Sequence, residues 1–299
     1  MILPSWRDGA TRDTIIEFLR ESQKIAPEQR IAAFDNDGTM WCEKPNYTQF
    51  YFLIDALKSA VEANPALVER PEYRAILDRD REAMGQLGLE RVGMALVDLF
   101  TGDTPEGFEV AVRSFFERVE HPDRGVPFKN MRYQPMLELL DAVRDHGFTV
   151  YVVTGGGAEF VRVVGRDFYD VTPAQVVGSQ IAYETRVEND VPVLIRTGEM
   201  FDSPNEGASK VPHLQRQIGQ RPMLAVGNSP GDAEMLEYAA AFDGPSLAMI
   251  VNHDDAEREY AYESVAGTFE TEETITEKAN RLGWTTISMR NDWETVFRV

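Results

Sequence analysis

One stretch near the start of the chain constrains its fold more than any other, namely Ile31-Ala32-Ala33-Phe34-Asp35-Asn36-Asp37-Gly38-Thr39. Its four apolar residues have the length and composition of a strand that is buried on both faces. Two carboxylates follow, two residues apart, and the Asp37-Gly38 step supplies the bend at which the chain leaves the strand. Because ligands in an open α/β sheet bind outside the carboxyl ends of the strands, we expect Asp35 and Asp37 to face a binding site.

Two later loops favour a site over the competing interpretation, an acidic turn that merely ends a strand. Thr154 and three glycines follow the β-branched run 149–153. Asn228 and Asp232 follow the apolar run 222–226. Parallel strands bring such loops to the same edge of a sheet.

A solitary lysine adds a possible cation to this edge. Lys210 is the only lysine between Lys129 and Lys278, and it precedes an apparent helix start. A single lysine is more often a solvated surface residue, so it gains meaning only beside the acidic loops.

Composition limits the class of partner. The 299 residues predict one large or two modest domains, and an apolar fraction of 43% is sufficient for a real core. A formal charge of −20 argues against nucleic acid and anionic membrane surfaces as partners. It leaves phosphorylated substrates open, because a metal ion and a few local cations can reverse the field inside a cleft.

Cysteine content and hydropathy indicate the compartment. The only cysteine is Cys42, which rules out an intrachain disulfide and favours a cytoplasmic protein. A periplasmic or secreted protein is the alternative if a leader has been removed. No stretch approaches the roughly 18 apolar residues of a membrane span.

The region between residues 47 and 119 shows helical patterns and no convincing strand. Because it directly follows the acidic motif, we interpret residues 44–130 as an inserted helical cap on a core of residues 1–43 and 131–299. The alternative is that these helices pack into a single domain.

The rest of the chain alternates apolar strands with amphipathic helices, which predicts an α/β fold with a doubly wound parallel sheet. A hairpin is expected around the turn 188–190, and residues 246–251 are expected to form the last parallel strand. The tail, residues 270–299, is expected to pack against the core as a helix and a strand.

Together the four segments resemble the haloacid dehalogenase-like phosphatase superfamily, with its Rossmann-like sheet. They occur in the family's order, as Asp35-Asn36-Asp37-Gly38-Thr39, Thr154, Lys210 and Gly227-Asn228-Ser229-Pro230-Gly231-Asp232. The helical cap after the first motif and the glycines after Thr154 are most similar to the phosphoserine phosphatase-like branch. The resemblance spans roughly residues 28–255.

The resemblance implies a Mg²⁺-dependent hydrolysis of a small phosphorylated metabolite. Asp35 is implied as the nucleophile that forms an aspartyl-phosphate, and Asp37 as the acid and base. The implied phosphate-binding groups are Thr154, Gly155 and Lys210, and the implied metal ligands are Asp35, Asp37 through its backbone carbonyl, Asn228 and Asp232.

Three positions qualify the resemblance. Asn228 stands where the family usually has an aspartate ligand, and Gly231 stands where phosphoserine phosphatases usually have asparagine. Glu43 is a possible specificity residue, although its offset from the motif is one residue short of the family's substrate-binding glutamate. An exposed loop glutamate is the alternative.

Other activities remain open at this point. Asn228 lacks the negative charge of the family's aspartate ligand. The main alternative is therefore a weakly active or inactive phosphate-binding homologue. Dehalogenation fits less well, since a departing halide needs no proton and Asp37 would have no role. A phosphomutase would use the same first step.

Overall fold

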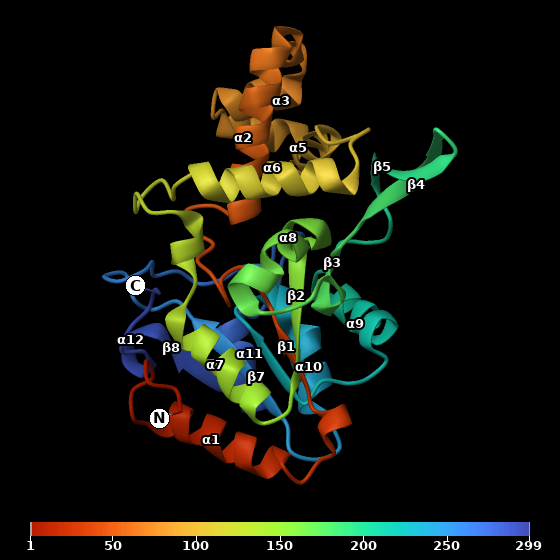
Figure 1. Ribbon diagram of the computed structural model, residues 1–299. Coiled ribbons are helices and arrows are strands. Elements are labelled where there is room, and N and C mark those ends of the chain that lie inside the picture. Colours follow the sequence, from red (N-terminus) through yellow and green to blue (C-terminus); the bar gives the residue numbers. More distant parts are fainter. Residues whose placement is uncertain (1, 299) are drawn as a thin grey trace.

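The computed structural model describes residues 2–298, and it describes residues 89 and 90 by their backbone alone. A parallel sheet of six strands forms its centre (Figure 1), in the order β3-β2-β1-β6-β7-β8. In that order the strands are Val176–Ser179, Thr149–Gly157, Ile31–Phe34, Leu224–Gly227, Leu247–Asn252 and Thr285–Ser288. The predicted α/β fold with a parallel sheet is confirmed.

Strand β1 is buried on both faces, as its composition predicts. Ala32 and Phe34 belong to the larger hydrophobic core, whereas Ala33 points to a second core on the opposite face. The first face is covered by α1 (Ala10–Ser22), α7 (Gln134–Asp145) and α8 (Ala158–Tyr169). The second is covered by α9 (Lys210–Ile218), α10 (Ala233–Ala240) and α11 (Ile275–Leu282).

The position of β1 in the sheet places its end at a crossover. β1 pairs with β2 on one side and with β6 on the other, so the chain changes direction across the sheet at β1. Such switch points open a crevice beyond the strand ends, and Asp35 follows β1 directly.

Between β1 and α7 the chain forms five helices, which gather at one end of the sheet (Figure 1). They are α2 (Thr48–Ala63), α3 (Pro71–Leu77), α4 (Arg81–Leu87), α5 (Leu89–Asp98) and α6 (Pro105–Arg118). Leu57, Tyr73 and Leu96 form part of a separate small core among them, whereas Phe52 and Phe115 join the large core. The division into a cap of residues 44–130 and a core remains a prediction.

The second half of the chain confirms the predicted hairpin and corrects one strand boundary. Strands β4 (Ile181–Glu188) and β5 (Val191–Met200) form an antiparallel pair. Strand β2 continues through Gly157 instead of ending at the glycines.

The strand at residues 246–251 is not the last parallel strand, because β8 pairs beside β7 in parallel. The prediction did not place β8 beside β7, because β8 is short and partly exposed and lacks the apolar run of a central strand. The tail does form a helix and a strand, as expected, and it ends with the short α12 (Met289–Asp292).

No helix among residues 2–298 combines the length and the apolar character that a bilayer-spanning helix requires.

Candidate active site

The turn after β1 is held by backbone hydrogen bonds that position both carboxylates. The Asp35 N–H donates to the Val226 carbonyl of β6 at 2.8 Å, which fixes the start of the turn. The Asn36 carbonyl accepts from the N–H groups of Thr39 and Met40. Gly38 has φ +75°, and a Cβ there would lie 2.1 Å from Asn228 Nδ2, so both the backbone angle and the space require glycine.

Lys210 joins β2 to the loops that follow β1 and β6. Its Nζ donates to Asp35 Oδ1 at 2.8 Å, to Asp232 Oδ1 at 2.5 Å and to the Val153 carbonyl at 3.0 Å. The side chain is 2% exposed, so the ammonium is held almost entirely by protein acceptors. The structure thus brings together the lysine and the carboxylates that the sequence placed 175 and 22 residues from it.

The charges of this cluster are strongly interdependent. Burial and the neighbouring Asp232 carboxylate raise the pKa of Asp35 well above its ordinary value, against the opposing effect of Lys210. Burial works to lower the pKa of Lys210, but Asp232 and Asp35 outweigh it and raise that pKa. The ammonium therefore stays charged, and its two carboxylates leave the cluster with an excess of negative charge when ionised.

Asp37 lies beside this cluster and is held by an indole. Trp41 Nε1 donates to Asp37 Oδ1 at 2.8 Å. Burial raises the pKa of Asp37 to about 6, against the lowering effect of the Trp41 hydrogen bond, and the Glu43 carboxylate adds to the rise. Such a carboxyl group is suited to exchange a proton near neutral pH.

The glycine loop after β2 is organised by Thr154 and by a residue that the sequence analysis missed. Thr154 Oγ1 accepts from the Gly156 N–H at 3.0 Å and is buried. Gln49, in the first turn of α2, accepts from the Gly157 N–H at 2.8 Å through Oε1. Gly155 faces the cavity described below, whereas Thr154 does not line it. Gln49 gave no sequence signal, because its partner lies 108 residues away.

Both carboxylate oxygens of Asp232 accept hydrogen bonds. Its Oδ2 accepts from the N–H groups of Asn228 and Ser229, each at 3.0 Å, and Oδ1 accepts from Lys210. The Asn228 side chain is 1% exposed, and its Nδ2 donates to Ser264 Oγ at 3.1 Å. Asp35, Asp37 and Asp232 line the cavity, and Asn228 lies behind them.

The oxygen atoms around Asp35 are chemically suited to Mg²⁺. Among the described residues, no protein donor contacts Asp35 Oδ2, and the carboxylate lines the cavity. Mg²⁺ prefers one or two carboxylates, with carbonyl, water and phosphate oxygens completing its shell. Among the residues whose side chains the structure describes, no cluster of three or more His, Cys, Asp or Glu is arranged to hold a metal. A Mg²⁺ site here would combine the Asp35 carboxylate with backbone, amide and substrate oxygens.

A second buried pair supports the acidic turn from behind. His253 Nε2 lies 2.9 Å from the Gly38 carbonyl, and His253 Nδ1 lies 3.3 Å from Glu259 Oε2. Burial works to raise the pKa of Glu259, but His253, together with hydrogen bonds from Cys42 and the Tyr260 N–H, holds that pKa below its ordinary value. These residues follow β7, and nothing in their spacing links them to residues 35–39.

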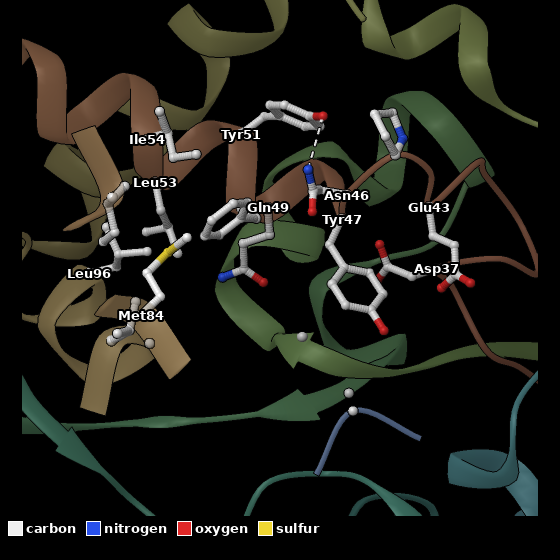
Figure 2. Close-up of a pocket in the computed structure, with 18 of the residues that line it drawn as sticks. Asp37, Glu43, Asn46, Tyr47, Gln49, Tyr51, Leu53, Ile54, Met84 and Leu96 are labelled. Carbon is white, nitrogen blue, oxygen red and sulfur yellow. Dashed lines mark hydrogen bonds between the residues drawn. The ribbon is translucent and has the colours of Figure 1, made fainter. Parts of the chain in front are cut away.

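A cavity of about 890 Å³ extends from the acidic turn into the helices between β1 and β2. Figure 2 shows Asp37 and Glu43 at one side, Leu53, Ile54, Met84 and Leu96 at the other, and Gln49 between them. Glu43 is 6% exposed, which excludes the exposed-loop interpretation of this residue.

Comparison with known proteins identifies related folds. The haloacid dehalogenase-like hydrolase family matches residues 32–237. A protein of unknown function from Bordetella pertussis Tohama I is similar in structure, with a TM-score of 0.55 and 16% identity over 87% of this chain and 98% of that chain. No curated protein matches this sequence.

Phosphoserine phosphatase-like proteins are also among the similar structures, at lower TM-scores. A phosphoserine phosphohydrolase-like protein from Francisella tularensis subsp. tularensis SCHU S4 has a TM-score of 0.38 and 17% identity over 85% of this chain and 99% of that one. A probable phosphoserine phosphatase from Vibrio cholerae has a TM-score of 0.41 and 15% identity over 82% of this chain and 65% of that one.

Proposed function

This chain belongs to the haloacid dehalogenase-like hydrolases, and we propose that it is a Mg²⁺-dependent phosphomonoesterase that works through an aspartyl-phosphate. The observation that carries the proposal is the contact of one buried ammonium, Lys210, with Asp35 and Asp232 beside the carboxyl group of Asp37. Nucleophile, cation and acid thus line one cavity.

In the first step, an Asp35 carboxylate oxygen attacks phosphorus, and the bond from phosphorus to the ester oxygen breaks. Lys210 holds the other carboxylate oxygen, Oδ1, at 2.8 Å and therefore fixes the direction of attack. Bound Mg²⁺ would neutralise phosphoryl charge and lower the pKa of Asp35, and its ligands would be Asp35, the Asp37 carbonyl and Asn228, with Asp232 in support through Lys210.

Asp37 gives its proton to the departing ester oxygen, which leaves as an alcohol. The carboxylate so formed then takes a proton from water, which attacks phosphorus and releases Asp35 and inorganic phosphate. The Trp41 hydrogen bond keeps Asp37 in one orientation through both steps.

The groups that would bind the phosphoryl oxygens are Lys210, the Gly155 N–H and Thr154. Gly155 faces the cavity. The Thr154 hydroxyl accepts from Gly156 and does not line the cavity, so Thr154 would act mainly by shaping the loop that presents the Gly155 N–H. Phosphoryl transfer depends mainly on such positioning and charge stabilisation.

The same cavity supports the proposed cap division. We propose residues 44–130 as the cap, because helices α2 to α5 of this segment supply one wall and the core supplies the other. Glu43, at the junction, would face the substrate rather than solvent.

Asn228 favours a second candidate, a weakly active or inactive phosphate-binding homologue. An amide in place of a carboxylate removes one negative charge near the metal ligands, and Asn228 lies behind the cavity wall. This candidate predicts phosphate binding without turnover.

Hydrolysis of p-nitrophenyl phosphate with and without Mg²⁺ decides between the two. The parent should turn over only with Mg²⁺, and Asp35→Asn should lower kcat by at least about 10³-fold, because removing a nucleophile removes the covalent route. Asp145→Asn, which changes an exposed aspartate on α7, should match the parent. Equal rates for parent and Asp35→Asn would refute the phosphatase.

A further inference from the structure

The cavity has two unlike ends, and the reaction described above uses only one of them. Asp35, Asp37 and Lys210 line the core end. Its volume of about 890 Å³ is near the upper limit of ~300–1,000 Å³ for sites that bind small molecules. Space therefore remains for a substantial leaving group beyond the phosphoryl position.

The remaining wall is apolar and comes from four helices. It consists of Phe50, Leu53, Ile54, Ile76, Leu77, Met84, Val92 and Leu96. Leu53, Ile54, Leu77 and Met84 are only partly buried, so part of their apolar surface faces the cavity. A large apolar pocket with polar groups at one end fits a ligand whose own apolar part is buried on binding.

The course of α2 sets the length of this apolar part. Tyr47, Leu53 and Ile54 all line the cavity, and Tyr47 lies beside Asp37 and Glu43 in Figure 2. A helix rises ~1.5 Å per residue, so the seven rises from the N-cap Tyr47 to Ile54 span about 10 Å. The leaving group can extend by about this distance from the ester oxygen.

Most polar side chains in this wall already take part in hydrogen bonds or are exposed. Asn46 Nδ2 donates to Tyr51 Oη at 3.3 Å, and Gln49 accepts from Gly157. Lys58, Arg79 and Arg81 also line the cavity, but they are exposed. In a chain with a net charge of −20, these cations can attract an anionic phosphate ester to the opening.

We propose that the substrate is a phosphate monoester of an apolar alcohol or phenol whose carbon body is about 10 Å long. This inference rests on the proposed phosphatase function and narrows its substrate class. A small polar ester such as phosphoserine would leave the apolar wall exposed to water. It would also find few free hydrogen-bonding groups there.

A homologous series of n-alkyl phosphates, from ethyl to decyl, tests the proposal below the critical micelle concentrations. Burial of each methylene contributes ~0.8 kcal/mol, so kcat/KM should rise about threefold to fourfold per carbon until the chain fills the cavity. Phenyl and naphthyl phosphates form a second arm that distinguishes an aromatic body from an aliphatic one. A flat series, or phosphoserine hydrolysed faster than octyl phosphate, would overturn the inference and leave the phosphatase intact.

A matched pair of variants tests whether the apolar wall is responsible for the rise of kcat/KM with chain length. Leu53→Gln places an amide in the apolar wall and should lower the ratio of kcat/KM for octyl over ethyl phosphate about tenfold. Leu194→Gln makes the same change at an exposed position of β5 outside the cavity and should leave that ratio unchanged. Equal ratios in both variants would contradict the assignment of the wall.

Binding of phosphonates separates this inference from the catalytic proposal. Calorimetry with octylphosphonate and ethylphosphonate needs no turnover, and octylphosphonate should bind at least tenfold more tightly. If no ester is hydrolysed but octylphosphonate binds preferentially, the phosphatase proposal fails and the apolar site stands. If both phosphonates bind alike, the apolar site is refuted.

Discussion

The two ends of the cavity differ in how their side chains are held. At the core end, Lys210 donates to three acceptors and Asp232 accepts from Lys210, Asn228 and Ser229, all of them buried or nearly so. At the cap end, Leu53, Ile54 and Met84 are partly buried and hold no fixed polar geometry. The core end therefore fixes the positions of reacting atoms. The cap end offers an apolar surface against which the leaving group can pack.

This difference predicts two kinds of response to substitution. A hydrogen-bonded charge cluster loses function abruptly, because removing one member leaves the others buried without a partner. An apolar wall changes in proportion to the area lost or the polarity gained. The variants below test which residues respond abruptly, as members of the charge cluster, and which respond in a graded way, as part of the apolar wall.

The largest effect is expected from Lys210→Met. It removes the cation that Asp35 and Asp232 share, so kcat should fall about 10²- to 10³-fold, as for loss of a charge-stabilising donor. The free energy of unfolding at pH 8 should also fall, by about 3–5 kcal/mol, because two buried carboxylates lose their partner. Kinetics and urea unfolding measure the two effects.

Lys24→Met is the control for this variant. Lys24 is exposed and pairs with the neighbouring Glu21, so neither activity nor stability should change by more than about 0.5 kcal/mol. A Lys210→Met protein with parental activity would show that the core end is not a catalytic cluster.

Asp37→Asn should stabilise the metal-free protein at alkaline pH. The pKa of Asp37 is raised from 3.8 to about 6 in the folded state, so ionisation above pH 6 costs stability that the amide does not lose. Because Asp37 is partly exposed, we expect a gain of about 1–2 kcal/mol at pH 8. The gain should shrink as pH falls from 6 toward 3.8 and vanish below it.

Urea unfolding in EDTA between pH 4 and 8 measures this dependence. Asp145→Asn, on the surface of α7, provides the comparison. If the gain in unfolding free energy did not change with pH, the pKa of Asp37 would not be raised in the folded protein. The assignment of Asp37 as the proton donor would then lose its electrostatic basis.

Asn228→Asp asks whether the residue behind the cavity wall contributes to metal binding. An added negative charge near a Mg²⁺ site should lower the Mg²⁺ concentration for half-maximal activity about tenfold, because ligand charge tunes affinity. Mg²⁺ titration of turnover measures it. An unchanged midpoint would remove Asn228 from the ligand set and leave Asp35 and the Asp37 carbonyl.

The smallest effect is expected from Gln49→Ala, at the boundary between the two ends. Loss of its hydrogen bond to the Gly157 N–H should lower kcat/KM about threefold to tenfold, in keeping with about 1 kcal/mol for a neutral hydrogen bond. Gln86→Ala, on the exposed face of α4, should have no effect. A loss as large as that of Lys210→Met would mean that the cap itself carries part of the catalytic geometry.

Sequence periodicity identified the central sheet because its signal is local. Residues 31–34 form an apolar run that only a doubly covered strand accommodates, and the structure places alternate residues in two cores. Strand β8 was misplaced in order because its partly exposed residues lack such a run, and only pairing with β7 makes it a strand. The same limit applies to the turn support from His253 and Glu259, which no spacing relates to Gly38.

The sequence by itself determined the α/β sheet and the acidic turn at the end of β1, because strand burial and turn chemistry are read from neighbouring residues. Only the tertiary structure decided that Lys210 reaches Asp35 and Asp232, and that Asn228 is buried and does not line the cavity. It also decided the apolar character of the cap end, because four helices must pack together before their half-buried faces enclose one space. Contacts between distant residues depend on how elements pack, and a linear pattern carries no record of that packing.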